Sequence, residues 1–249
     1  MDDLSVIVSE TLEAMSSDET AKKRSRNVET LRGVRGTPLA EIAQIAAAVW
    51  EEYRPGVDAA DALTALFGTA WEDGLVAIGL LAAALIDSPA DGLDIGLDWL
   101  ERVDDIATAD ALGWLVLGPG ALLSQQAPMA AFDGLRAHPR PEVRRAAMMA
   151  ALAYLPVPIE GAAAAPLRAR LRESHAQYVD TPQSPAVAEI ATAFLRDESP
   201  AVRKALRREL RTWAKADPAA TAAWGDSIKG GLPKLLKPEV DKARRKIAK

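Results

Sequence analysis

The sequence predicts an all-α fold, a curved solenoid made of stacked helix pairs in a single domain. The 249 residues are 49% hydrophobic but only 5% aromatic, and 50 of them are alanine, the strongest helix former. Apolar residues recur at helical spacing along most of the chain, and no comparable alternating stretch suggests a strand. A chain of this length and hydrophobicity is able to bury a sizeable core.

The expected helices follow one another between clusters of Pro and Gly. After Thr37-Pro38, one apolar face comprises Leu39, Ile42, Ala43, Ala46 and Val49. A second face comprises Leu75, Ile78, Gly79, Ala82 and Leu85. Proline stands where a helix would begin at Pro38, Pro141 and Pro200. We predict about a dozen helices joined by short turns, as one helical domain over 1–230 and a basic C-terminal helix or tail over 231–249.

A short repeat narrows the architecture. Pro141–Ala146 and Pro200–Ala205 share the pattern P-x-V-R-(R/K)-A, which resembles the second helix of a HEAT repeat. Proline and valine seat the helix start, arginine reaches an adjacent loop or carboxylate, and alanine allows close packing. The copies lie farther apart than the usual period of roughly 40 to 47 residues. We therefore expect an extra or irregular helix between them, within a curved HEAT-like stack that has a concave face.

Charge is distributed unevenly along the chain. The segment 37–133 has sixteen acidic residues and two basic ones, which makes it a poor surface for a phosphate backbone. The segment 196–249 has fifteen basic residues against seven acidic ones. Anions are therefore expected to dock on the C-terminal part, although its last residues, 242–246, also fit a solvated helix end.

Several chemistries are excluded or disfavoured. The absence of cysteine rules out disulfides, thiolate metal sites and cysteine nucleophiles, and His138 and His175 have no partner at ligand spacing. No glycine-rich phosphate loop is present. We expect no metal and no cofactor. The acidic start and the short apolar run 74–86 predict a cytoplasmic protein without a membrane segment.

Five segments in order resemble the DNA alkylation repair family of HEAT-like glycosylases, the AlkD-like proteins. Together with the helices between them, they cover roughly residues 10 to 225. They are the segments Gly33–Ala43, Trp71–Gly74, Asp98–Asp104, Pro141–Leu152 and Val202–Pro218.

The resemblance implies binding of duplex DNA in the concave face and hydrolysis of the glycosidic bond of a cationic alkylpurine. In the family pattern, a W-x-x-V-D segment sets a tryptophan four residues before an aspartate, a later K-A-x-x-W segment supplies a second tryptophan, and an arginine lies close by. The carboxylate and the ring faces stabilise a cation at the sugar.

Two of the four family positions keep the family residue in this chain, and the two tryptophans are replaced. Asp104 matches the aspartate and Arg145 the arginine, whereas Leu100 and Arg208 occupy the tryptophan positions. Because Arg208 places a positive charge where the reaction develops one, we expect weak or absent glycosylase activity. Glu72-Asp-Gly74 also lacks the arginine of its family segment.

Two functions remain open at this point. The first is a DNA-binding protein acting on damaged or distorted duplex DNA through Arg32, Arg35, Arg144, Arg145, Arg203, Lys204, Arg207, Arg208 and Arg211. The second is a non-catalytic helical scaffold that binds a protein partner, which the acidic segment 37–133 favours. Asp104 also fits a solvated helix carboxylate, Arg144 and Arg145 fit salt bridges between repeats, and the six tryptophans fit packing in the core.

Overall fold

The computed structural model of the chain describes residues 4–156 and 182–248, and all regular structure in this part is helical. The N-terminal helices are α1 (Leu4–Ala14), α2 (Asp18–Ser25), α3 (Leu39–Tyr53), α4 (Ala60–Thr69), α5 (Trp71–Ala84), α6 (Pro89–Trp99) and α7 (Ile106–Leu112). The C-terminal helices are α8 (Gly118–Leu123), α9 (Pro128–Arg136), α10 (Pro141–Ala150), α12 (Ser184–Ala193), α13 (Pro200–Ala216), α14 (Pro218–Ser227) and α15 (Lys237–Ile247). Short helical turns cover Val57–Ala59, Leu100–Arg102, Gly113–Leu117 and Ala151–Tyr154.

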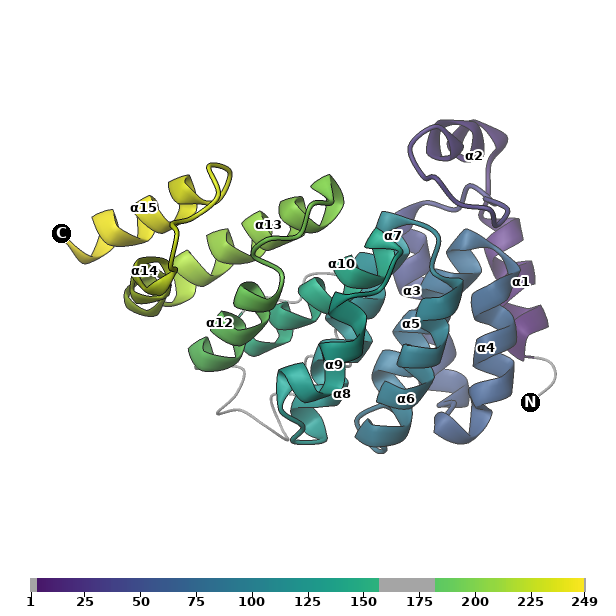
Figure 1. Cartoon of the computed structure of the whole chain (residues 1–249). Helices are drawn as coiled ribbons and strands as arrows, with labels where there is room; N and C mark the ends of the chain where they lie inside the picture. Colours follow the sequence, from purple (N-terminus) through teal and green to yellow (C-terminus); the bar gives the residue numbers. More distant parts are fainter. Residues whose placement is uncertain (1–3, 157–181, 249) are drawn as a thin grey trace.

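The helices form two parallel rows, as a HEAT-like solenoid requires. One row consists of the second helix of each pair, α5, α7, α10, α13 and α15, and each packs on the next; we call it the second-helix row. The first helices, α4, α6, α9, α12 and α14, form the other row, in which α8 lies between α6 and α9. Figure 1 shows the stack running from the N-terminus at one end to the C-terminus at the other. The predicted fold class is therefore confirmed.

The two repeat copies begin neighbouring helices of the second-helix row. Pro141 opens α10 and Pro200 opens α13, where the missing N–H of proline is harmless. Val143 and Val202 are fully buried just inside each helix. Helices α10 and α13 pack directly against each other as second helices of their pairs, the role that the repeat pattern predicts for both copies.

Close packing at the centre of the stack depends on two glycines. The helix α7 continues through a π-helical turn, Gly113–Leu117, into α8. A Cβ at Gly113 would lie 2.2 Å from the carbonyl oxygen of Ala146, and one at Gly118 would lie 2.3 Å from that of Ala150. Both carbonyls belong to α10, so only glycine permits this approach.

The run Ile106–Leu123 is long and apolar enough to cross a membrane by length and composition, and 56% of it is buried inside the fold. That burial is typical of a core helix in a helical repeat. The C-terminal segment is a packed helix rather than a loose tail, because α15 contacts α13 and α14 and buries Val240 and Ala243. His175 lies in 157–181, outside the described residues, and so does this part of the stretch in which an extra or irregular helix is expected between the repeat copies.

Candidate nucleic-acid interface

The helix α13 presents a basic face to solvent. Its buried side holds apolar residues such as Val202, Leu206 and Trp213. The opposite side carries five of the residues that the sequence predicts to bind DNA, Arg203, Lys204, Arg207, Arg208 and Arg211. Arg208 and Arg211 are about half exposed, at 52% and 51%. The structure thus brings these five residues together on one surface of the second-helix row.

Two predicted site residues, Arg145 and Arg208, converge on a carboxylate that the sequence analysis did not select. Arg145 donates to both oxygens of Asp110, with Nε–Oδ1 at 2.6 Å and Nη2–Oδ2 at 2.8 Å. Nη1 of Arg208 lies 3.7 Å from Oδ2 of the same residue. Asp110 is on α7, so α7, α10 and α13 each supply one charged group to this cluster. The side chain of Asp110 is 20% exposed and that of Arg145 only 9%.

An aromatic ring completes the cluster one helical turn beyond Asp110. The guanidinium carbon of Arg208 lies 5.9 Å from the ring centroid of Trp114, a cation–π distance. The indole Nε1 of Trp114 is buried and has no hydrogen-bond partner in the described part of the chain. Trp114 lies in the π-helical turn, a departure from α geometry that is frequent at functional sites. The polar groups Asp110, Arg145 and Arg208 and the ring of Trp114 form what we call the Asp110 cluster.

Asp104 has a different set of partners. Its carboxylate accepts a bond from Thr30 Oγ1 at 2.9 Å and from the backbone N–H of Leu31 at 2.6 Å. Nη2 of Arg32 lies 3.3 Å from its other oxygen. These donors all belong to the segment that joins α2 to α3. Asp104 therefore anchors that segment, and the contacts of Arg145 and Arg208 described above are with Asp110 instead.

Three further arginines of the predicted interface, Arg32, Arg35 and Arg144, form ion pairs and hydrogen bonds within the fold. Arg32 pairs with Asp105 at 3.0 Å and donates to the carbonyl of Phe67. Arg35 pairs with Asp73 at 2.6 Å, and that hydrogen bond raises the pKa of the guanidinium.

Arg144 pairs with Asp197 at 2.7 Å and donates to the carbonyl oxygen of His138. The side chains of Arg32, Arg35 and Arg144 are 10%, 19% and 16% exposed, so their charges are largely neutralised by carboxylates within the protein. The alternative that Arg144 and Arg145 bridge repeats matches these contacts.

The same pairs neutralise part of the acidic segment 37–133. Glu72, Asp73 and Asp105 are buried and lie against Arg24, Arg35 and Arg32, respectively. These arginines all come from the sequence before residue 37. The acidity of the segment is therefore partly internal and weighs less against DNA binding than its local net charge suggests.

Leu100, which the sequence comparison with the family pattern sets at the first tryptophan position, is inaccessible. Leu100 is 1% exposed, and its carbonyl oxygen accepts a bond from Arg140. The neighbouring Trp99 stacks on Phe67 with ring centroids 4.5 Å apart and donates to Thr64. Trp50, Trp71, Trp213 and Trp224 are buried as well, which confirms packing roles for five of the six tryptophans.

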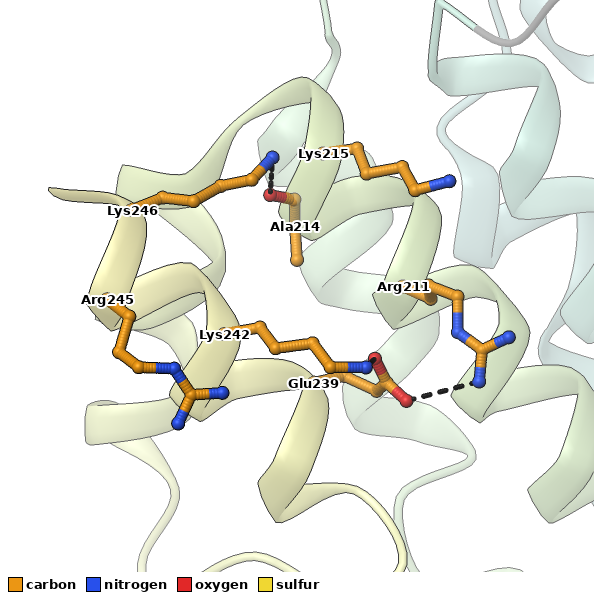
Figure 2. A pocket seen from close by; sticks show the side chains of 7 residues that line it. All are labelled: Arg211, Ala214, Lys215, Glu239, Lys242, Arg245 and Lys246. Carbon is orange, nitrogen blue, oxygen red and sulfur yellow. Dashed lines mark hydrogen bonds and ion pairs between the residues drawn. The ribbon is translucent and has the colours of Figure 1, made fainter.

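A second concentration of positive charge lies between α13 and α15. Figure 2 shows a groove with side chains of α13 on one side and of α15 on the other. Its lining residues are Arg211, Ala214, Lys215, Glu239, Lys242, Arg245 and Lys246; we call it the α13–α15 groove. Of these, only Arg211 was selected from the sequence.

Sequence reasoning also missed Asp110 and Trp114. The available signal was spacing, because Ile106 stands four residues before Asp110, as the family tryptophan stands before its aspartate. Ile106 is 47% exposed at the start of α7. The motif favoured Leu100 and Asp104 at the same separation, because Val103 before Asp104 matches the valine of the family pattern, whereas Ala109 stands before Asp110.

Comparison with known proteins places this geometry in context. A family model described as DNA alkylation repair enzyme matches residues 8–240. Among solved structures, the chain is similar to AlkD2 from Streptococcus mutans, with a TM-score of 0.54 and 14% identity. The alignment covers 92% of this chain and 98% of that one, and at this identity it shows the fold alone. No relative was found among curated proteins.

Proposed function

Because the chain belongs to the DNA alkylation repair enzyme family, we propose that it binds duplex DNA along the second-helix row and holds a cationic alkylpurine at the Asp110 cluster. The observation that carries the proposal is the convergence of Arg145 and Arg208 on Asp110 beside the basic face of α13. Exposed arginines and lysines attract the phosphate backbone and release its counterions.

The proposed reaction is hydrolysis of the N-glycosidic bond. The base leaves with the electron pair of the broken bond, which cancels its positive charge, and water adds hydroxide to the sugar carbon while its proton passes to solvent. A carboxylate near the sugar stabilises the developing cation. Asp110 is our candidate for this role because it lies beside Arg145, Arg208 and the basic face of α13. Asp104, the residue that the resemblance nominates, instead accepts its hydrogen bonds from the segment between α2 and α3.

The composition of the Asp110 cluster favours a low rate of base release. Ile106 offers no electron-rich ring at the position four residues before Asp110, and Arg208 keeps a positive charge 3.7 Å from the carboxylate. Both features disfavour the positive charge that develops on the sugar in the transition state. We therefore propose that release of N3- or N7-alkylated purines is slow compared with a member of the family that has both tryptophans.

Excision measured on duplex DNA with a single 7-methylguanine tests the assignment. Asp110→Asn should reduce the rate by about 100 to 1000-fold, the usual effect of removing one transition-state contact. Asp104→Asn is the matched control and should retain the native rate once folding is confirmed by circular dichroism. Loss of activity in Asp104→Asn with full activity in Asp110→Asn would reverse the assignment.

DNA binding is tested separately through its salt dependence. Affinity for duplex DNA should fall steeply with salt, and Arg203→Glu together with Arg208→Glu should weaken it by at least about tenfold at low salt. Lys229→Glu with Lys234→Glu changes the same charge outside the basic face and should have a much smaller effect. If the native chain fails to bind DNA even at low salt, the protein-partner scaffold becomes the better explanation.

A further inference from the structure

The α13–α15 groove is strongly positive. Five of its seven lining residues are cations, Arg211, Lys215, Lys242, Arg245 and Lys246, and one is an acid, Glu239. Ala214 is the remaining lining residue, and its small side chain leaves room between the two helices. In the described part of the chain, neither Lys215 nor Arg245 has an ion-pair partner. The groove therefore contains more positive charge than its own carboxylate neutralises.

Glu239 organises the cations around the groove. Its side chain is 0% exposed and accepts bonds from Lys242 at 3.0 Å, Arg207 at 3.1 Å and Arg211 at 3.3 Å. Burial alone would raise the pKa of Glu239, but the hydrogen bonds from Lys242, Arg211 and Arg207 prevail and lower it to about 2. The carboxylate thus stays charged at any physiological pH and holds three cationic side chains in fixed positions.

The pattern is that of a preorganised anion site. Lys246 adds a fourth anchored cation, since its Nζ lies 3.4 Å from the carbonyl oxygen of Ala214. Lys215 and Arg245 remain available to contact a ligand, and Figure 2 shows both reaching outward from the two helices. A group with several acceptor oxygens and more than one negative charge fits such a set of donors.

We propose that the α13–α15 groove binds phosphate groups, and that in the complex with DNA it holds backbone phosphates beyond the Asp110 cluster. The second part rests on the proposed function, whereas phosphate binding by the groove does not. Because Arg207 and Arg211 lie on the same face of α13 as Arg208, the groove continues the basic surface toward the C-terminal end of the stack. The bound duplex must then be long enough to reach α15.

The test uses the two lining cations that have no ion-pair partner in the described residues. Lys215→Ala with Arg245→Ala is compared with Lys229→Ala with Lys234→Ala, which removes the same charge from outside the groove. Binding of tripolyphosphate, measured by calorimetry, should be lost in the groove variant and kept in the control. Affinity for a lesion-free duplex should fall about tenfold in the groove variant, and the slope of log K against log salt should decrease by about two.

Each outcome has a separate meaning. Equal behaviour of the two variants toward tripolyphosphate would overturn the groove as a phosphate site. Loss of tripolyphosphate binding with unchanged DNA affinity would limit the groove to small phosphate ligands and overturn its contact with the backbone. If the native chain bound tripolyphosphate but no DNA, the proposed function would fail while the phosphate site would stand.

Discussion

A buried carboxylic acid lies on the inner side of α13. Glu209 is fully buried, neither of its oxygens has a hydrogen bond in the described part of the chain, and burial raises its pKa well above 4.5. In the unfolded chain the same group ionises near 4.5. The unfolded state therefore releases a proton as pH rises above 4.5 while the folded state keeps it, so stability falls with rising pH in this range.

Glu209→Gln should remove this pH dependence. The free energy of unfolding at pH 8 should rise by more than about 1 kcal/mol, because a shift of one pKa unit is already worth about 1.4 kcal/mol. At pH 4 the variant and the native chain should be nearly equal. Urea unfolding at both pH values provides the measurement, and Glu198→Gln is a control outside the core that is expected to change little. A stabilisation that is the same at pH 4 and pH 8 would contradict the argument.

Single residues also show where sequence reasoning stops. The spacing of a motif and the valine at position 103 nominate Asp104, and nothing local indicates that Asp110 lies beside basic residues. What separates them is contact with residues distant in sequence, namely Thr30 and Leu31 for Asp104 and Arg145 and Arg208 for Asp110. Likewise, the helical pattern of the sequence predicts the basic face of α13. It does not predict the carboxylates that pair with Arg32 and Arg35.

At the scale of elements, helix starts are the most predictable feature. Proline at positions 141 and 200 sets the first turn of α10 and α13 whatever packs around them. The π-helical turn at Gly113–Leu117 is different, because it depends on how closely the helix approaches α10. The sequence displays the glycines but not the neighbour that requires them.

Gly113→Ala tests that close approach. The added methyl would meet a backbone carbonyl of α10, so we expect a loss of about 1 to 3 kcal/mol in the free energy of unfolding. Gly134→Ala on α9 is the matched control, because a methyl group added there would meet no atom of another described element within 4 Å. The control should gain up to about 1 kcal/mol from helix propensity. Equal effects of the two substitutions in thermal unfolding would show that contact with α10 is not limiting.

The segment between α2 and α3 is the element most dependent on one side chain. Asp104→Ala removes acceptors used by Thr30, Leu31 and Arg32, so the segment should open more often while the stack remains folded. Limited trypsin digestion should then cleave faster after Arg26, Arg32 and Arg35, the basic residues of this segment. Asp98→Ala, an exposed change on α6, should digest at the native rate. Unchanged cleavage in Asp104→Ala would mean that Arg32 and its remaining partners suffice.

At the scale of the whole molecule, each helix pair of the stack contacts mainly the pairs before and after it. Such a fold is stabilised by the pairs and by their interfaces, with little contribution from distant parts. The N-terminal end departs from this rule. Arg24, Arg32 and Arg35 precede α3 and α4 in sequence, yet each forms an ion pair with a residue at the start of α5 or α7.

These ion pairs make the two ends of the protein unequal in their resistance to force. Under force applied to the termini, α15 and α14 should detach first and in small steps, since only neighbouring helices retain them. The N-terminal end should resist until the pairs Arg24–Glu72, Arg32–Asp105 and Arg35–Asp73 break, and then release α1 through α5 in one long step. An optical-trap recording would show this order as short extensions followed by a long one, and Arg32→Ala should divide the long extension into shorter ones.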